Sequence, residues 1–338
     1  MDYFFIFFLL VVAGLATIKV IFTGTDLDEQ YAVALGYRMA RGDRMFMEMW
    51  EPHQTSGFLA AVLIRIYIML TGGVNGLVIY LRLSGAFFQM LVSVLIYFTC
   101  KKICSAKMAF VTAVFFYNTL PKYSQTPDFS NMLLWFSTLM FLSLVTCFAE
   151  EDSRPRWLIP GGISTALLIL SYPTCLLVVA PVCVGIWRVS EKGRKFRNLT
   201  YYLGCCAICG AAWLSYFMLH MSSGEFLYGL KQMMTDGSHS ATILDKLTEY
   251  KANVITIFPF VITVFVAVWW VLRVCFKKNS YSFLLILLTM SVVQQLFIWI
   301  FMNRHLKFPG LFYLILLLVG IWRYAKRQQY VAVEKSRI

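Results

Sequence analysis

Three carboxylates stand within four residues of one another, directly after the first hydrophobic segment of the chain: Asp26, Asp28 and Glu29. If this stretch is helical, Asp26 and Glu29 share a face because they are three residues apart, while Asp28 points elsewhere. A carboxylate near a membrane surface can take the proton from a hydroxyl that attacks a sugar. Such acids can also be satisfied by backbone N–H groups at a helix N-terminus, and both interpretations stay open here.

Other residues with catalytic or binding chemistry are expected at the same face of the membrane. All four histidines and 11 of the 17 acids fall at or outside the predicted outer boundary. Cations there can hold a leaving lipid phosphate, whose charge grows as a glycosidic bond breaks, so the set favours sugar transfer from a lipid-linked phosphate. The predicted phosphate-binding residues are Lys122, Arg304 and Lys307, and the predicted substrate-cavity residues are Asp26, Glu51, His53, Gln54, Arg82, Asp128 and His305.

Structural alternatives exist for several of these residues. Asp26 and Asp128 could cap helices, and Arg304 and Lys307 could anchor the outer interface. His53 could contact the acceptor or a divalent ion, or be a simple interfacial histidine. Arg82 sits in the outer third of a predicted span, where its charge is costly unless it is paired or faces water.

The elements that must position these residues are membrane helices. The chain of 338 residues is 59% hydrophobic and 14% charged, with a mean hydropathy of +0.70. Many apolar runs approach the ~20 residues that cross a bilayer as a helix, the fold expected where the backbone must bond itself. We therefore predict an all-α, polytopic membrane protein, one integral membrane domain over 1–338, with about 10 transmembrane helices. The spans are placed at roughly 3–23, 75–100, 108–123, 130–149, 157–171, 174–188, 199–220, 253–274, 281–302 and 309–323.

Two long polar connections are predicted outside the membrane. Residues 24–73 form the first extracytoplasmic loop, with interfacial helices near 28–40 and 58–70, and residues 221–252 form a later one. The 58–70 segment is kept out of the spans because its crossing would put every later basic cluster on the outer side.

The net charge of +13 follows this topology. With the N-terminus inside, 18 of the 30 Lys and Arg residues are cytoplasmic, and the two sides carry +12 and +1. This is the positive-inside asymmetry, so we expect both termini in the cytoplasm, a plasma (inner) membrane location and no nucleic-acid partner.

Short motifs follow one another in order along the first half of the chain. They are Asp28…Gly36…Gly42, Trp50-Glu51-Pro52-His53-Gln54-Thr55-Ser56-Gly57, Leu81-Arg82-Leu83-Ser84-Gly85, Thr126-Pro127-Asp128, and Gly161-Gly162 followed by Ser171-Tyr172-Pro173-Thr174. Over roughly the first 190 residues, this order resembles the membrane-embedded glycosyltransferases of the GT-C type, which include protein mannosyltransferases and aminoarabinose transferases.

The resemblance implies a polyprenyl-phosphate sugar donor, an inverting transfer to a lipid, glycan or protein acceptor, and Asp28 as general base with Glu29 assisting. Aminoarabinose transferases carry an Arg shortly after the Asp-Glu pair, where this chain has Gln30-Tyr31. The phosphate contact is therefore expected from Lys122 or Arg304. We assign no metal ligands and no certain cofactor, and leave a divalent metal open.

Two other function classes compete with the transferase. A lipid-sugar flippase or transporter needs polar residues deep in its spans, and the obvious examples are Gln89 and Gln294-Gln295. Such a protein should also show an internal repeat, and none is visible in the sequence. The third class is a non-catalytic scaffold of a polysaccharide assembly complex.

Overall fold

The computed structural model describes residues 3–25, 27–49, 53–103, 106–120, 124–148 and 155–234. Within these ranges the structure is helical and contains no strand, as the all-α prediction requires. The predicted spans after residue 252 and most of the 221–252 loop lie outside the described residues. The total of about 10 transmembrane helices therefore stays a prediction.

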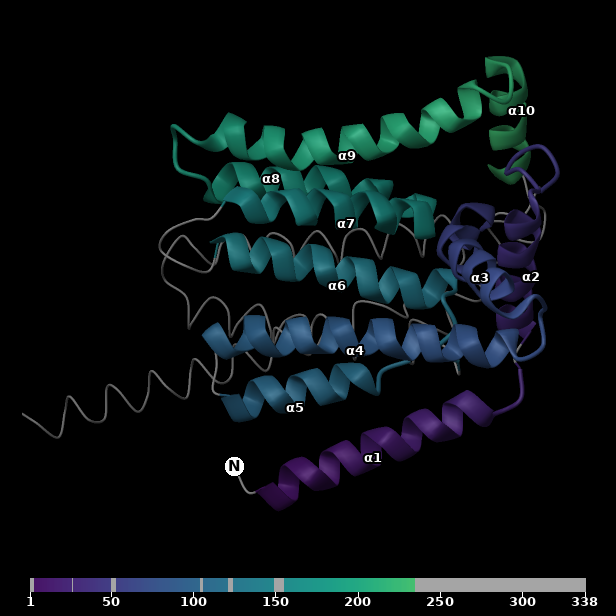
Figure 1. The fold of residues 1–338 in the computed structure, drawn as a ribbon. Coiled ribbons are helices and arrows are strands. Elements are labelled where there is room, and N and C mark those ends of the chain that lie inside the picture. The colour runs from purple at the N-terminus through teal and green to yellow at the C-terminus, as the bar shows by residue number, and fades with distance from the viewer. Residues whose placement is uncertain are drawn as a thin grey trace, which may run out of the picture.

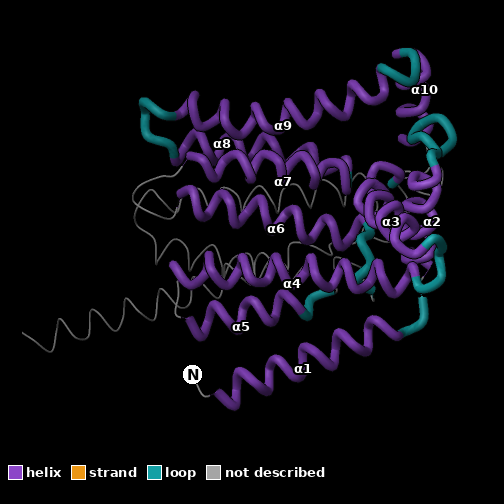
Figure 2. Tube along the Cα trace, in the orientation of Figure 1, coloured by secondary structure: helices purple, strands orange, loops and turns teal. Residues whose placement is uncertain are grey.

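Helices run side by side through most of the described chain (Figures 1 and 2). In order they are α1 (Tyr3–Phe22), α4 (Leu77–Ile103), α5 (Ala106–Tyr117), α6 (Phe129–Phe148), α7 (Leu158–Ser171), α8 (Val179–Val189) and α9 (Lys195–Met218). Short 3-10 turns at Pro155–Trp157 and Pro173–Val178 precede α7 and α8. The closest packing joins α6 to α7, α4 to α5 and α7 to α9.

Three further helices lie together at one end of this bundle (Figure 1). They are α2 (Leu27–Arg41), α3 (Phe58–Thr71), which a 3-10 turn η1 (Gln54–Gly57) precedes, and α10 (Ser223–Met234). We call this the α2–α3 end of the bundle. The opposite end holds the last residues of α4, α6 and α8 and the first residues of α5, α7 and α9. We call it the basic end because Lys101, Lys107 and Lys195 lie there.

Within the described ranges, four helical segments are long and apolar enough to cross a membrane: Tyr3–Phe22, Gln54–Thr71, Leu77–Lys101 and Lys195–Met218. Large exposed apolar side chains on α1, such as Phe4 and Leu15, form the kind of surface that lipid covers. Length and composition alone do not show whether α3 is an interfacial helix or crosses the membrane. It packs mainly against α2 and also contacts α4, and its assignment as an interfacial helix stays a prediction (Figure 1).

Local chemistry explains where several helices begin and end. Gly72 ends α3 in the left-handed conformation (φ 72°), and its N–H donates to the carbonyl of Ile68. The span predicted at 108–123 is shorter than expected, since α5 ends at Tyr117 and Pro121 follows closely. The span predicted at 174–188 begins instead with a 3-10 turn at Pro173, and α8 starts only at Val179.

One apolar core is built from residues of all the helices from α4 through α9. Its largest fully buried members include Trp135, Phe116 and Tyr202. One polar group inside this core is fully paired: the Gln89 carboxamide donates to the carbonyls of Phe116 (2.8 Å) and Thr119 (3.0 Å) and accepts from the Trp135 indole. Gln89 thus joins α4, α5 and α6 and has its amide engaged within the protein. The transporter hypothesis relied on Gln89 as an open polar group, and this geometry removes that support.

Candidate functional site

A buried ion pair joins α2 to α4 at the α2–α3 end. The Arg82 guanidinium donates from Nε to Glu29 Oε1 (2.7 Å) and from Nη2 to Glu29 Oε2 (2.5 Å). The two side chains are 3% and 1% exposed, so water does not screen the pair. Arginine makes this two-pronged contact with a carboxylate because its N–H donors have a fixed fork geometry.

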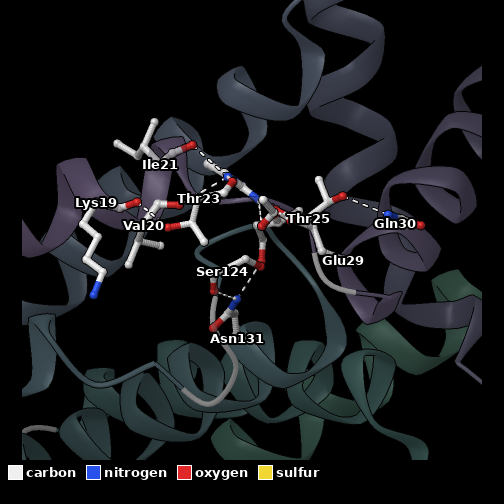
Figure 3. A network of polar contacts seen from close by, with 12 residues as sticks. Lys19, Val20, Ile21, Thr23, Thr25, Glu29, Gln30, Ser124 and Asn131 are labelled. Atoms are coloured by element: carbon white, nitrogen blue, oxygen red, sulfur yellow. Dashed lines mark hydrogen bonds and ion pairs between the residues drawn. The ribbon is translucent and has the colours of Figure 1, made fainter.

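The same guanidinium also holds the end of α1. Arg82 Nη1 donates to the carbonyls of Ile21 (2.8 Å) and Thr23 (2.6 Å), and Nη2 donates to that of Gly24 (3.2 Å) (Figure 3). A helix C-terminus leaves its last carbonyls without helical partners and carries partial negative charge, so a cation there is stabilising. Arg82 therefore fixes the direction in which the chain leaves α1 and enters α2.

The turn before α6 supplies the third side of this network. The hydroxyl of Thr126 donates to Glu29 Oε1 (2.5 Å), and Ser124 contributes a further hydrogen bond. Asn131 Nδ2 holds the turn by donating to the carbonyls of Ser124 (3.0 Å) and Thr126 (2.8 Å) (Figure 3). The Glu29 carboxylate is thus surrounded by donors from two other segments of the chain.

Asp128 caps the helix that follows this turn. Its Oδ1 accepts from the backbone N–H of Asn131 (2.6 Å), and the residue is 1% exposed. Of the two alternatives open for Asp128, the structure shows the capping contact at the N-terminus of α6. A buried cap at this point fixes the turn that carries Thr126.

These contacts set the charge of Glu29. Burial by itself raises the pKa of this carboxyl, but the hydrogen bonds from Arg82 and Thr126 and the positive charge of Arg82 outweigh burial and hold the pKa below its ordinary value. Glu29 is therefore ionised near neutral pH, with its carboxylate oxygens directed to protein donors.

Asp28 lies in a different environment although it is the next residue. It stands in the first turn of α2 and is partly exposed, whereas Glu29 is 2% exposed. Successive residues of a helix project about 100° apart, so the anchored Glu29 side chain fixes the direction of Asp28 as well. The two acids predicted as a catalytic pair are thus one partly exposed carboxylate and one buried carboxylate.

His53 lies where the turns before α3, α6 and α8 meet. Its ring stacks on Phe129 (centroids 4.3 Å apart) and on Tyr172 (5.4 Å). Three motifs that are far apart in the sequence therefore meet here, because Phe129 follows Asp128 directly and Tyr172 belongs to the Ser-Tyr-Pro-Thr motif. The next residue, Gln54, is fully buried and accepts from the backbone N–H of Phe46 (2.7 Å).

The loop between α2 and η1 packs on the last helices of the described chain. Phe46, in a left-handed conformation (φ 64°), contacts Trp213, Phe217 and Phe226 with edge-on ring geometry. This conformation is unfavourable for a residue with a side chain and persists only where the surroundings impose it. The aromatic contacts and the Gln54 bond together impose it, and they connect α2, η1, α9 and α10.

Several predicted site residues lie outside the described residues, namely Asp26, Glu51, Lys122, Arg304, His305 and Lys307. The structure brings Glu29 and Arg82 into contact, and places Asp28, His53, Gln54 and Asp128 at the same end of the bundle. In the described part of the chain, no three His, Cys, Asp or Glu side chains are grouped as metal ligands.

Several residues that build this region were not predicted from the sequence. Ser124, Thr126 and Asn131 are small polar residues of the kind that fill any turn, so their sequence carries no distinguishing signal. Tyr172 lies in one of the sequence motifs, but the sequence indicated no role for its side chain. Phe46 has no sequence signal among the chain's 29 phenylalanines.

Residues 55–220 match the family model described as dolichyl-phosphate-mannose-protein mannosyltransferase. Comparison with curated proteins and with solved structures gives no match. The matched residues run from η1 to just after α9 and make up just under half of the chain. This match confirms the resemblance to glycosyltransferases of the GT-C type that the sequence motifs indicated. The apolar helices fit a membrane protein of that kind.

Proposed function

We propose that this protein transfers a sugar from a polyprenyl-phosphate donor to a hydroxyl group of a lipid, glycan or protein acceptor, with Asp28 as general base. The observation that carries the proposal is the contrast between Asp28 and Glu29. Asp28 is partly exposed in the first turn of α2, and the adjacent Glu29 is buried against Arg82 and Thr126. A base must reach its substrate, and Asp28 has the exposure for this while Glu29 does not.

In the proposed reaction, Asp28 takes the proton of the acceptor hydroxyl as the oxygen attacks the anomeric carbon. The bond between this carbon and the donor phosphate breaks, and the phosphate leaves with the electron pair. Attack from the side opposite the phosphate inverts the configuration at that carbon. Lys122, Arg304 and Lys307 are proposed to stabilise the leaving phosphate, because cations offset the charge that develops there.

We assign Glu29 and Arg82 positioning roles in place of the direct roles predicted from the sequence. Glu29 offers its carboxylate to Arg82 and Thr126, and Arg82 directs each of its three guanidinium nitrogens to a protein oxygen. Both groups are thus directed to protein partners. Their contact fixes the first turn of α2 against α1 and α4, and so sets the position of Asp28.

The reaction is proposed at the outer face of the plasma membrane. The described residues Lys101, Lys107 and Lys195 lie at the basic end, opposite the α2–α3 end that carries Asp28. Basic residues are retained on the cytoplasmic side, so this arrangement supports the proposal that Asp28 lies outside and the N-terminus inside.

Asp28→Asn tests the proposal, because the amide keeps the shape of the side chain but cannot accept the proton. With a polyprenyl-phosphate sugar and membrane acceptors, transfer by the purified variant is expected to fall about 10²–10⁴-fold, the usual effect of losing a general base. Asp43→Asn is the matched control, since Asp43 pairs with Arg38 (2.7 Å) in the same loop. Transfer by Asp28→Asn at the rate of Asp43→Asn would contradict the role of Asp28.

A further inference from the structure

Buried polar atoms without a hydrogen-bond partner gather around η1. Gln54 Nε2 and Thr55 Oγ1 have none in the described chain, and the two residues are 0% and 3% exposed. Asn131 Oδ1 also has no hydrogen-bond partner in the described chain, and Asn131 is 1% exposed. An unsatisfied buried polar group costs about 1–3 kcal/mol, so such groups are rare without a functional reason.

These atoms belong to neighbouring segments. The ring of His53, one residue before Gln54, stacks on Phe129, two residues before Asn131. The η1 turn also contacts α6 and α7. His53, Phe129 and Tyr172 are each partly exposed, so the aromatic stack beside these segments reaches the surface of the protein.

The hydrogen bonds already present fix how each group can act. Gln54 Oε1 is held by the Phe46 N–H, which leaves Nε2 as a donor. Asn131 Nδ2 is held by the carbonyls of Ser124 and Thr126, which leaves Oδ1 as an acceptor. The Thr55 hydroxyl can donate or accept. The set thus offers a donor, an acceptor and a group of both kinds.

We propose that Gln54, Thr55 and Asn131 bind the hydroxyl groups of a neutral sugar. A sugar hydroxyl both donates and accepts, and so matches this set, whereas a phosphate would require donors only and gains from positive charge. The proposal rests on the transferase function and adds the recognition of the sugar to it. The sugar can belong to the donor or to the acceptor, and the experiment separates the two.

Thr55→Val is the main test, because valine keeps the shape and removes only the hydroxyl. Since that hydroxyl has no partner within the described chain, we expect the melting temperature to stay equal or rise. Gln54→Glu is the second variant, because it keeps the acceptor for the Phe46 N–H and replaces the free donor. Thr165→Val is the control: Thr165 donates to the Gly161 carbonyl (2.8 Å) and bonds Tyr202 (2.9 Å), so its loss should lower the melting temperature and leave sugar binding unchanged.

Binding is measured on the purified full-length protein with bare polyprenyl phosphate and with the same lipid carrying mannose, glucose, galactose or N-acetylglucosamine. The sugar with the tightest wild-type binding is then used for the variants. If it is the donor sugar that these residues bind, Thr55→Val and Gln54→Glu should weaken its binding about tenfold and leave the bare lipid unchanged. If they bind an acceptor sugar, donor binding is unchanged and the KM for a glycan acceptor rises by a similar factor.

Unchanged donor binding together with an unchanged acceptor KM would overturn the proposal. A wild-type protein that binds none of the sugar lipids more tightly than the bare lipid, and transfers to no glycan acceptor, would also overturn it. These outcomes are distinct from failure of the catalytic role, since Asp28→Asn tests the chemical step while the binding arm requires no chemistry.

Discussion

The two ends of the bundle carry charge in opposite ways. At the α2–α3 end, the side chains of Glu29 and Arg82 are 1% and 3% exposed and are paired with each other, and Arg82 also donates to backbone carbonyls. At the basic end, Glu191 and Arg194 form a pair of 3.2 Å whose side chains are 67% and 46% exposed. In the sequence the two ends look alike, because each has charged residues next to apolar helical segments. Burial separates them: one pair organises the fold around a candidate site, and the other is a solvated feature of the topology.

The largest expected effect comes from breaking the buried pair. Glu29→Gln leaves the Arg82 charge buried without its counter-charge, and such changes cost about 3–5 kcal/mol. We expect a large fall in the melting temperature of the purified protein in detergent. Glu191→Gln removes the exposed pair at the basic end, which should change stability by less than about 1 kcal/mol. Equal shifts for the two variants would show that burial does not separate the two ends.

A glycine substitution gives the next largest effect. At Gly85 in α4, an added Cβ would lie 1.5 Å from the carbonyl oxygen of Gln125, which is backbone and cannot move aside alone. Gly85→Ala is therefore expected to push the Ser124–Thr126 turn away from Glu29 and to destabilise by about 1–3 kcal/mol or more.

Gly204 in α9 offers the control, because an added Cβ there meets no atom within 4 Å. Gly204→Ala should stabilise by about 0.5–1 kcal/mol, since alanine loses less backbone freedom in a helix. Both melting temperatures are read in the same assay. A neutral Gly85→Ala variant would mean that the close approach between α4 and the Gln125 backbone is not required.

The smallest effect concerns pH. Because the pKa of Glu29 lies below its ordinary value of 4.5, its ionised form stabilises the fold above pH 4.5, and this contribution is lost as the pH falls through the lowered pKa. The gap in melting temperature between the wild type and Glu29→Gln should therefore be constant above about pH 5 and narrow in more acid solution. A gap that widens on acidification would contradict the sign of this shift.

The helices of the α2–α3 end and of the bundle could be predicted because their signals are local. Apolar runs of the right length gave α1, α4, α6, α7 and α9, and the helix expected near residues 28–40 corresponds to α2. The errors in predicted helix boundaries also have local causes. Pro121 follows the early end of α5, and Pro173 begins a 3-10 turn where a regular helix was expected.

The contacts of the candidate site could be predicted only in part. Arg82 in a predicted span indicated that a partner or water must be near, which the structure confirms. The identity of that partner was not predictable, because Glu29 is 53 residues earlier and no spacing rule links the two. The roles of Thr126 and Asn131 depend on the fold of one turn, so their residue types alone could not indicate them.

The sequence distance between Glu29 and Arg82 also bears on how the protein is made. The chain is synthesised from its N-terminus, so α1 and α2 exist before the helix that carries Arg82 has left the ribosome. During that interval the Glu29 carboxylate has no guanidinium, and the last carbonyls of α1 have no Arg82 to cap them. When α4 inserts, Arg82 supplies the partner of the Glu29 carboxylate and of the α1 carbonyls at the same time. Variants of either partner should therefore lower the amount of protein that accumulates in the membrane, an effect on biogenesis that precedes any effect on turnover.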